Sequence, residues 1–355
     1  MSLDATYMRR ALQLAKNGLG SSAPNPMVGA VIVLEKIIIG EGYTSAYGGP
    51  HAEVNAINSV KDRQLLSKAI LYVTLEPCSH HGKTPPCVDL IVKYNIPKVF
   101  IGVCDPHEKV AGKGIKRLKE AGCIVTVGVL AKECEAHHKR FLTFHKKQRP
   151  YIILKWAETR DGFIAPEKNK RNPDALPYWI SNKYSRQLVH KWRSQEQAIL
   201  VGTNTVLHDN PMLNVRQWAG KSPIRIVLDR DLKIKGNYHS LDKSVKTIIF
   251  TEVKDKSQWL NGIDYEVIDF IKNRPQQICE VLHKHNITSL LIEGGAKTLQ
   301  SFIDAKLWDE ARVVTGKINF GDGLKAPEFF GNIAHTIQVA TDIITIYKND
   351  QKYHI

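Results

Sequence analysis

The chain has 355 residues, which favours two domains, and its 43% hydrophobic and 24% charged residues are ordinary for a globular protein. No apolar run approaches the ~20 residues of a membrane span, and the N-terminal segment lacks the apolar core of a signal peptide, so we expect a cytoplasmic protein without a membrane partner. The net charge of +15 fits either a nucleic-acid partner or small phosphorylated ligands, and charge alone does not choose between them.

The first part of the chain alternates predicted helices with predicted strands. The strands fall within residues 21–33, 37–43, 69–75, 98–104 and 123–129. The helices are expected at 4–17, from 51, from 85–86, at 113–121 and at 131–147. This alternation predicts an α/β layered sheet with helices on both faces. Functional residues then belong at the carboxyl ends of strands, where Cys78 and Asp105 fall.

The stretch from His51 to Cys87 carries the strongest chemical signal. His51-Ala52-Glu53 opens a predicted helix, a strand leads to Pro77-Cys78, and a polar loop leads to Cys87. One imidazole and two thiolates give zinc three protein ligands, and a site with three keeps a position for water, whereas structural sites usually have four. Zinc lowers the pKa of that water to about 7. Glu53 is then free to move protons, as in zinc-dependent nucleobase deaminases.

The loop between the two cysteines departs from the generic signature. It has eight residues, where the signature has two, and it places His80, His81 and Lys83 beside the presumed metal. A structural Cys/His site or unrelated buried thiols remain the alternatives, and a non-enzymatic zinc module would need His80 or His81 as a fourth ligand. The other cysteines are expected to be inert core thiols: Cys104, Cys123, Cys134 and Cys279.

Three other polar residues of the first part have two interpretations each. Asn25 lies in a Pro-Asn-Pro turn before an apolar strand and is either a plain turn residue or a substrate contact. His137 and His138 lie within a predicted helix, far from other ligand types, so we interpret them as surface or hydrogen-bonded histidines and not as metal ligands.

The second part repeats the alternation after the basic segment 145–150, which we interpret as a domain joint. Its predicted strands fall at 151–157, 198–202, 223–229, 247–250, 289–295 and 308–316, and the polar stretch 165–178 is expected to be an exposed loop. Gly294 and Gly295 precede a predicted helix, where a phosphate could approach the helix N-terminus. The segment 202–205 has the same order of strand, glycine and helix. Either glycine segment alone is equally well a turn, but together they favour a nucleotide cofactor.

Long segments of the chain resemble one enzyme family. HAE, TLEPCSHHGKTPPC and APNPMVGAVIV are similar to the deaminase half of the bifunctional riboflavin-biosynthesis deaminase–reductases. KWAETRDGFIA, YWIS, VGTNTVLHDNPMLNVR and IEGGAKT are similar to the reductase half. The resemblance runs in order over essentially the whole chain. It implies a cytidine-deaminase-like αβα domain at 1–147 and a dihydrofolate-reductase-like α/β domain at 148–355, with Zn²⁺ and NADPH as cofactors and a homo-oligomer as a possible assembly.

The resemblance also implies roles for individual residues. His51, Cys78 and Cys87 hold zinc, and Glu53 is the proton shuttle. Asn25 and Lys83 are expected at the deaminase substrate from their positions in the sequence and not from the resemblance. In the second domain Lys155 and Asp209 match polar residues near the reduced carbon. The NADPH-contacting positions are Ala157, Trp179, Thr205, Asp209 and the segment from Gly295, and Gly294 is expected to contact the cofactor from its place before the predicted helix. The substrate positions are Arg193, Leu213, Arg216 and Glu293, of which the two arginines are either phosphate contacts or surface charges.

The chain differs from the family pattern at three places. Thr44 stands where the family usually has His, and Pro177, two residues before Trp179, stands where it often has Ser. Arg230 also replaces a Ser, and its planar guanidinium would suit the 2′-phosphate of NADPH.

The expected substrate is a phosphorylated diamino-ribosylamino-pyrimidinone that is first deaminated and then reduced at C1′ of its ribose by NADPH. The main rival is a nucleic-acid base deaminase with a basic RNA-binding second domain, which predicts salt-sensitive RNA binding. The glycine segments favour the dinucleotide, so we expect a small-molecule substrate and no nucleic acid.

Overall fold

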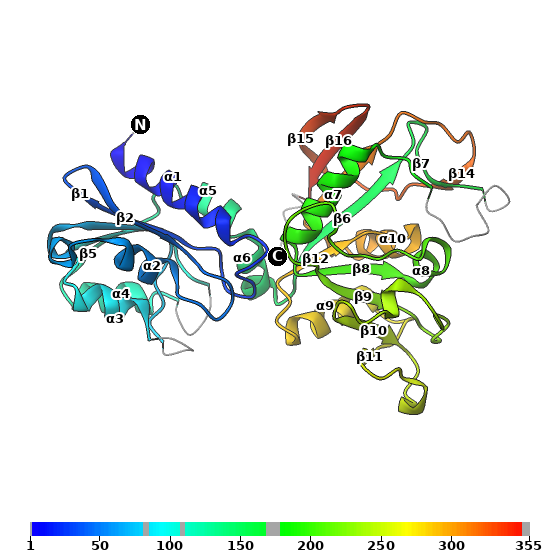
Figure 1. The fold of residues 1–355 in the computed structure, drawn as a ribbon, viewed down its shortest axis with the longest axis horizontal. Helices are drawn as coiled ribbons and strands as arrows, with labels where there is room; N and C mark the ends of the chain where they lie inside the picture. Colours follow the sequence, from blue (N-terminus) through cyan, green and yellow to red (C-terminus); the bar gives the residue numbers. More distant parts are fainter. Residues whose placement is uncertain (1, 81–84, 107–110, 168–177, 350–355) are drawn as a thin grey trace. The chain divides into compact units, whose positions relative to one another are not determined.

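The computed structural model describes residues 2–80, 85–106, 111–167 and 178–349. The chain divides into two compact units, Met1–Gln148 and Arg149–Ile355, drawn from blue to cyan and from green to red in Figure 1. None of the helices in these described stretches is long and apolar enough to cross a membrane.

The first unit is built on a five-stranded sheet of order β2-β1-β3-β4-β5. β1 pairs antiparallel with β2 and β3, and β3, β4 and β5 run parallel. Its strands are β1 Gly29–Leu34, β2 Ile37–Tyr43, β3 Ile70–Leu75, β4 Lys98–Val103 and β5 Ile124–Val127. Its α-helices are α1 Leu3–Ala15, α2 Ala52–Ser59, α3 Cys87–Lys93, α4 Lys113–Glu120, α5 Ala131–His137 and α6 Lys139–Lys147.

Helices cover both faces of this sheet, as the sequence predicts (Figure 1). Successive strand residues point to opposite faces, so Ala30 and Ile32 pack with α2, α3 and α4, whereas Val31 and Val33 pack with α1 and α5. Because both faces are buried, β1 is apolar at every position. The carboxyl ends of β3 and β4 lie side by side, which positions the loops that follow them.

The structure corrects two predictions for this unit. The helix expected at 131–147 is interrupted at His138, where α5 ends and α6 begins. Cys104 is exposed, because β4 ends at Val103 and the chain leaves the sheet there, whereas the other three thiols predicted to be buried are buried. The prediction that the two histidines are hydrogen-bonded is confirmed: His137 Nε2 lies 2.8 Å from the Met27 carbonyl, and His138 Nε2 lies 3.1 Å from Thr74 Oγ1. The other ring nitrogen of His138, Nδ1, is buried without a hydrogen-bond partner among the described residues.

The second unit is built on a nine-stranded sheet of order β11-β10-β9-β8-β12-β6-β13-β16-β15. The strands from β11 to β13 run parallel, and β16 and β15 complete the sheet as an antiparallel hairpin. The parallel strands are β6 Tyr151–Glu158, β8 Ala198–Gly202, β9 Ile224–Leu228, β10 Thr247–Thr251, β11 Asp264–Val267, β12 Ser289–Ile292 and β13 Glu310–Thr315, and the hairpin is β15 Asn332–Val339 and β16 Asp342–Lys348.

Helices also cover both faces of the second sheet. α9 (Arg274–Lys284) and α10 (Ala296–Asp304) pack on one face, and α7 (Lys183–Gln195) and α8 (Thr203–Asp209) pack on the other. The prediction of an exposed loop at 165–178 is wrong for its first two residues. Ala165 and Pro166 belong to β7 (Phe163–Pro166), which pairs with β14 (Gly323–Lys325). Residues 168–177, including Pro177, lie outside the described residues.

Candidate active sites

The structure brings His51, Cys78 and Cys87 together. His51 is the N-cap of α2, Cys78 follows the end of β3, and Cys87 is the first residue of α3. His51 Nδ1 lies 3.6 Å from Cys78 Sγ and 3.4 Å from Cys87 Sγ. A tetrahedral zinc with Zn–N near 2.0–2.1 Å and Zn–S near 2.3 Å separates N and S ligands by about 3.6 Å. The three side chains therefore fit one zinc ion.

The two sulfurs of this cluster are not equivalent. The hydrogen bond from Cys87 and the proximity of His51 lower the pKa of the Cys78 thiol to about 4, against the effect of burial. The same hydrogen bond, together with burial, raises the pKa of Cys87 above its ordinary value. Zinc binds cysteine as the thiolate, so metal binding would require both sulfurs to be deprotonated. Within the described residues no further His, Cys, Asp or Glu joins the cluster, and His81 lies outside those residues.

Glu53 lies beside the cluster on the first turn of α2 and is only 3% exposed. Burial raises the pKa of its carboxyl group, and the negative charge of Cys78 raises it further. A buried carboxyl group with a raised pKa accepts a proton more readily than an exposed one, as a proton carrier must. The geometry thus combines a metal site with a proton carrier.

The structure describes three of the other deaminase residues singled out in the sequence and leaves two outside the described residues. Asn25 is half-buried in a turn in which its backbone N–H donates to the Ser22 carbonyl (3.0 Å). Thr44 is buried, and its hydroxyl accepts a hydrogen bond from the Val28 N–H (3.0 Å), so it anchors the chain shortly after that turn. His80 is exposed and outside the cluster of ligands. His81 and Lys83 lie outside the described residues.

In the second unit Lys155, Arg193 and Glu293 form a buried ionic cluster. β6 and β12 are parallel neighbours whose register pairs Leu154 with Ile292, so the next residues, Lys155 and Glu293, also lie together. The Arg193 guanidinium donates two hydrogen bonds to Glu293 (2.8 and 2.7 Å), and Lys155 Nζ lies 3.7 Å from the same carboxylate. Burial opposes ionisation, but the two cations hold the pKa of Glu293 at about 2. Burial lowers the pKa of Lys155.

A turn that contacts Arg193 adds a third cation, Arg216. Leu213 is buried with a φ of 52°, and the next residue, Asn214, accepts from Arg193 through its carbonyl (3.2 Å) and from Arg216 through its side-chain oxygen (3.0 Å). His190 Nδ1 lies 3.4 Å from the Arg216 N–H. Burial and the neighbouring arginines lower the pKa of His190 to about 4, so its imidazole is neutral.

Sequence reasoning missed His190 and Asn214. His190 precedes Arg193 by three residues on α7, a spacing that places both side chains on one face of a helix. Asn214 lies within a segment that carries the family resemblance. Both signals are visible in the sequence, but neither indicates which partner the side chain contacts.

The two glycine segments singled out in the sequence meet in space. β8 and β12 are adjacent and parallel, and the Gly202 N–H donates to the Gly294 carbonyl (3.2 Å). A Cβ added at Gly295 would lie 3.2 Å from Thr205 Oγ1, so side chains there would narrow the space between the segments. Gly295 is also the N-cap of α10. Backbone that is free of side chains at a helix N-terminus fits the phosphates of a dinucleotide.

The other predicted NADPH positions lie on different elements. Ala157 is on β6, two residues after Lys155 and therefore on the same face. Trp179 is exposed, with the Arg186 guanidinium 4.5 Å from its ring centre, and Asp209 is the last residue of α8. Arg230 follows β9, is exposed, and donates to Glu252 (2.7 Å).

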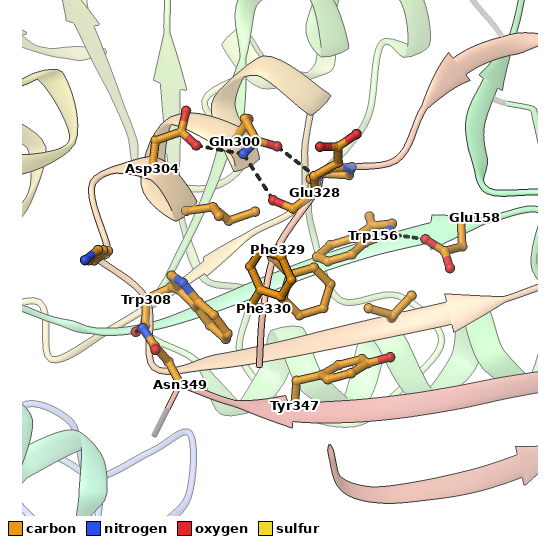
Figure 2. Close-up of a pocket in the computed structure, with 14 residues that line it drawn as sticks. Trp156, Glu158, Gln300, Asp304, Trp308, Glu328, Phe329, Phe330, Tyr347 and Asn349 are labelled. Carbon is orange, nitrogen blue, oxygen red and sulfur yellow. Dashed lines mark hydrogen bonds between the residues drawn. The ribbon is translucent and has the colours of Figure 1, made fainter. Parts of the chain in front are cut away.

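A cavity of 730 Å³ in this unit is lined by none of the residues of the ionic cluster. Figure 2 shows the side chains that line it. Trp156 and Glu158 line it, and on a strand these residues face opposite to Lys155 and Ala157. Phe329 packs edge-on against Trp156 and Trp308 inside it. The cavity therefore opens on the other face of the sheet from the predicted reductase residues.

Comparison with known families defines the class of protein. Residues 1–103 match the cytidine and deoxycytidylate deaminase zinc-binding region, and residues 150–350 match the RibD C-terminal domain. Together with the His/Cys/Cys cluster, these matches define a zinc-dependent deaminase joined to a reductase.

Individual relatives narrow the class to one family. The chain is 40% identical to the riboflavin biosynthesis protein RibD of Actinobacillus pleuropneumoniae over 91% of this chain and 86% of that protein, and 38% identical to that of Aquifex aeolicus over 91% and 89%. A crystal structure of a diaminohydroxyphosphoribosylaminopyrimidine deaminase/5-amino-6-(5-phosphoribosylamino)uracil reductase from Thermotoga maritima is 34% identical, with a TM-score of 0.87 over 98% of both chains. Acinetobacter baumannii RibD is 31% identical, also with a TM-score of 0.87 over 98% of both chains.

The chain belongs to the RibD family and is a bifunctional deaminase and NADPH-dependent reductase of riboflavin biosynthesis, with zinc as the metal of its deaminase. These comparisons confirm the resemblance, the fold class and the two cofactors predicted from the sequence. They do not favour the nucleic-acid deaminase.

Proposed function

We propose that the first unit deaminates 2,5-diamino-6-ribosylamino-4(3H)-pyrimidinone 5′-phosphate, and that the second unit then uses NADPH to reduce the ribosyl group of the product to ribityl. The observation that carries the first step is the three-ligand cluster with Glu53 beside it. The Thermotoga maritima enzyme, which is similar over 98% of both chains, is named as a deaminase and then a reductase, and this supports the order of the two reactions.

In the deaminase, His51, Cys78 and Cys87 are proposed to hold the zinc ion. Zinc bound there would lower the pKa of its water to about 7 and so supply the nucleophile. Glu53 accepts the proton of that water and delivers it to the leaving amine, so that ammonia departs. The raised pKa of Glu53 suits both halves of this transfer, because the group must be readily protonated after it acts as a base. Asn25 and Lys83 are proposed to contact the substrate.

In the reductase, NADPH supplies the hydride and the chain positions the sugar phosphate. Lys155, Arg193 and Arg216 carry three positive charges against the one negative charge of Glu293, so the cluster has an excess that suits a phosphate dianion. Arg193 already binds Glu293 through two nitrogens and Asn214 through the third, which leaves Arg216 as the better phosphate contact.

Lys155 and Asp209 are proposed to act near the reduced carbon, with Leu213 and Glu293 shaping the substrate site. Ala157, Trp179, Thr205, Asp209, Gly294 and Gly295 are proposed to contact NADPH. Arg230 follows β9, whose end pairs with Gly202 of β8, so it lies on the same edge of the sheet as the glycines. It would have to leave Glu252 to bind a 2′-phosphate.

We place the deaminase domain at 1–147 and the reductase domain at 148–355, and the enzyme in the cytoplasm. The two matched families, at 1–103 and 150–350, support this division. All six cysteines are free, as expected in a reducing compartment.

The proposal is tested by two coupled assays on the purified full chain. Ammonia release from the diamino substrate is measured with the zinc content quantified, and NADPH consumption is then measured on the product. We expect one zinc per chain, ammonia release that a chelator abolishes, and NADPH oxidation only after deamination. Ammonia release that persists without metal would contradict the first step, and NADPH oxidation on the diamino substrate at an equal rate would contradict the order.

A further inference from the structure

Glu76 is a buried carboxylate that none of the roles above uses. It follows the end of β3 and is 3% exposed. Its Oε2 accepts hydrogen bonds from the backbone N–H groups of Asp105 (3.2 Å) and Gly112 (3.1 Å). Its Oε1 accepts from those of Gly114 (3.0 Å) and Ile115 (3.2 Å). One side chain thus binds four backbone donors from the segment that follows β4.

The chemistry of these bonds requires a carboxylate. Only an ionised carboxyl group offers acceptors on both oxygens and no donor. Gly114 and Ile115 lie in the first turn of α4, where unpaired N–H groups and the helix dipole favour a negative charge. Hydrogen bonds from backbone N–H groups to an ionised acceptor are also stronger than neutral ones. The Glu76 side chain is therefore held in one position by α4 and by the residues before it.

Two backbone contacts connect the hydrogen-bonded Glu76 to the zinc cluster. The Pro77 carbonyl packs against α4 so closely that a Cβ added at Gly114 would lie 2.3 Å from the Pro77 oxygen. Cys78 follows directly, and its own carbonyl accepts from the Val88 N–H of α3 (3.2 Å). The backbone on the N-terminal side of Cys78 is therefore held by α4, and the backbone at Cys78 is held by α3.

We infer that Glu76 is a positioning residue for the metal site: its hydrogen bonds to the β4–α4 segment hold Pro77 and Cys78 so that the Cys78 sulfur stays within binding distance of His51 and Cys87. This inference rests on the proposed zinc ligands. Residues that orient metal ligands without touching the metal typically contribute 10- to 100-fold to metal affinity or activity.

The test replaces Glu76 by Gln, which keeps the shape but turns an NH₂ group toward two of the N–H donors. We expect zinc affinity, measured by chelator competition, to fall about 10- to 100-fold. With cobalt in place of zinc, the thiolate charge-transfer band should shift or weaken. Deaminase kcat should fall more than KM rises, and NADPH oxidation on the already deaminated substrate should be unchanged.

Glu41→Gln is the matched control. Glu41 makes a two-pronged ion pair with Arg10 (2.6 and 2.9 Å) in the same unit and takes no part in the cluster. It should lower thermal stability without changing zinc affinity or the cobalt spectrum. If Glu76→Gln lowers stability but leaves affinity and spectrum within twofold of the parent, Glu76 only stabilises the fold and the inference is wrong.

A second variant covers the case in which Glu76→Gln does not fold. Gly114→Ala keeps Glu76 itself, but the added Cβ would lie 2.3 Å from the Pro77 oxygen and 3.1 Å from Glu76 Oε1. It should therefore displace both groups and change zinc affinity and the cobalt spectrum in the same direction. Parent-like values for this variant would contradict the inference. Failure of the parent chain to bind zinc or release ammonia would instead overturn the proposed function, so the two failures are distinguishable.

Discussion

The zinc cluster and the ionic cluster of the reductase are assembled in different ways. The three zinc-site residues come from one continuous stretch between His51 and Cys87, which spans α2, the end of β3 and the start of α3. The reductase cluster joins Lys155 to Glu293, far along the chain, and takes Arg193 from a helix between them. The first site is thus defined by local spacing, and the second by the register of parallel strands.

The two clusters also have opposite electrostatic character. Cys78, Cys87 and Glu53 provide acidic groups that a cation would compensate. Around Glu293, the cations outnumber the carboxylate, and a phosphate dianion would compensate them. The difference predicts that changes in either cluster affect one reaction and spare the other, and the following experiments test that separation.

The largest effect is expected for Glu53→Gln. Loss of the proton carrier should lower the rate of ammonia release by about 10²- to 10⁴-fold. Zinc content, measured by metal analysis, should be unchanged because Glu53 is outside the ligand cluster. NADPH oxidation on the deaminated substrate should also be unchanged. Undiminished deamination would refute the role of Glu53.

Lys155→Ala should impair the reductase by about 10²-fold, since removal of one charge that stabilises a transition state commonly costs that much. Hydride transfer is followed by the loss of NADPH absorbance on the deaminated substrate, and ammonia release serves as the internal control. Lys116→Ala, on the exposed face of α4, controls for the loss of a lysine. Equal losses in both reactions would argue against separate sites.

Arg216→Ala should raise KM for the phosphorylated substrate of the reductase about tenfold, because a hydrogen bond to a charged group contributes roughly 1.5–3 kcal/mol. Its effect should be confined to that substrate. A dephosphorylated analogue should show no difference between variant and parent, since it lacks the group that Arg216 is proposed to bind. A similar rise in KM for both compounds would assign Arg216 to another contact.

The smallest effect concerns the pH dependence of stability. Folding lowers the pKa of His190 to about 4 from the ordinary 6.5, so between these pH values the unfolded chain binds a proton that the folded chain does not. The stability that the neutral imidazole contributes above pH 6.5 is therefore lost as the pH falls toward 4. His190→Gln removes this pH-dependent contribution to stability. The free energy of unfolding of the variant should therefore decline less between pH 7 and 5 than that of the parent.

Tryptophan fluorescence during urea unfolding provides the measurement. It reports on the second unit alone, because all six tryptophans lie there: Trp156, Trp179, Trp192, Trp218, Trp259 and Trp308. Parallel pH curves for His190→Gln and the parent would show that His190 does not titrate on unfolding in this window.

The sequence by itself predicted the layered α/β architecture, the three candidate zinc ligands, Glu53 beside them and the glycine segments. These features depend on local spacing: apolar residues repeat with the period of a strand or helix, and the ligands are carried by a single short stretch. The family resemblance added Lys155, Arg193 and Glu293, which no local pattern connects.

Only the tertiary structure decided how distant residues pair and which side chains are buried. It showed that Cys104 is exposed, that Arg193 is bound to Glu293, that His190 and Asn214 join Arg216, and that Glu76 accepts hydrogen bonds from backbone N–H groups of α4. It also placed Ala165 in a strand and divided the last helix of the first unit at His138. Each of these depends on strand register and on contacts between segments far apart in the chain, and those contacts are established only when the hydrophobic cores form.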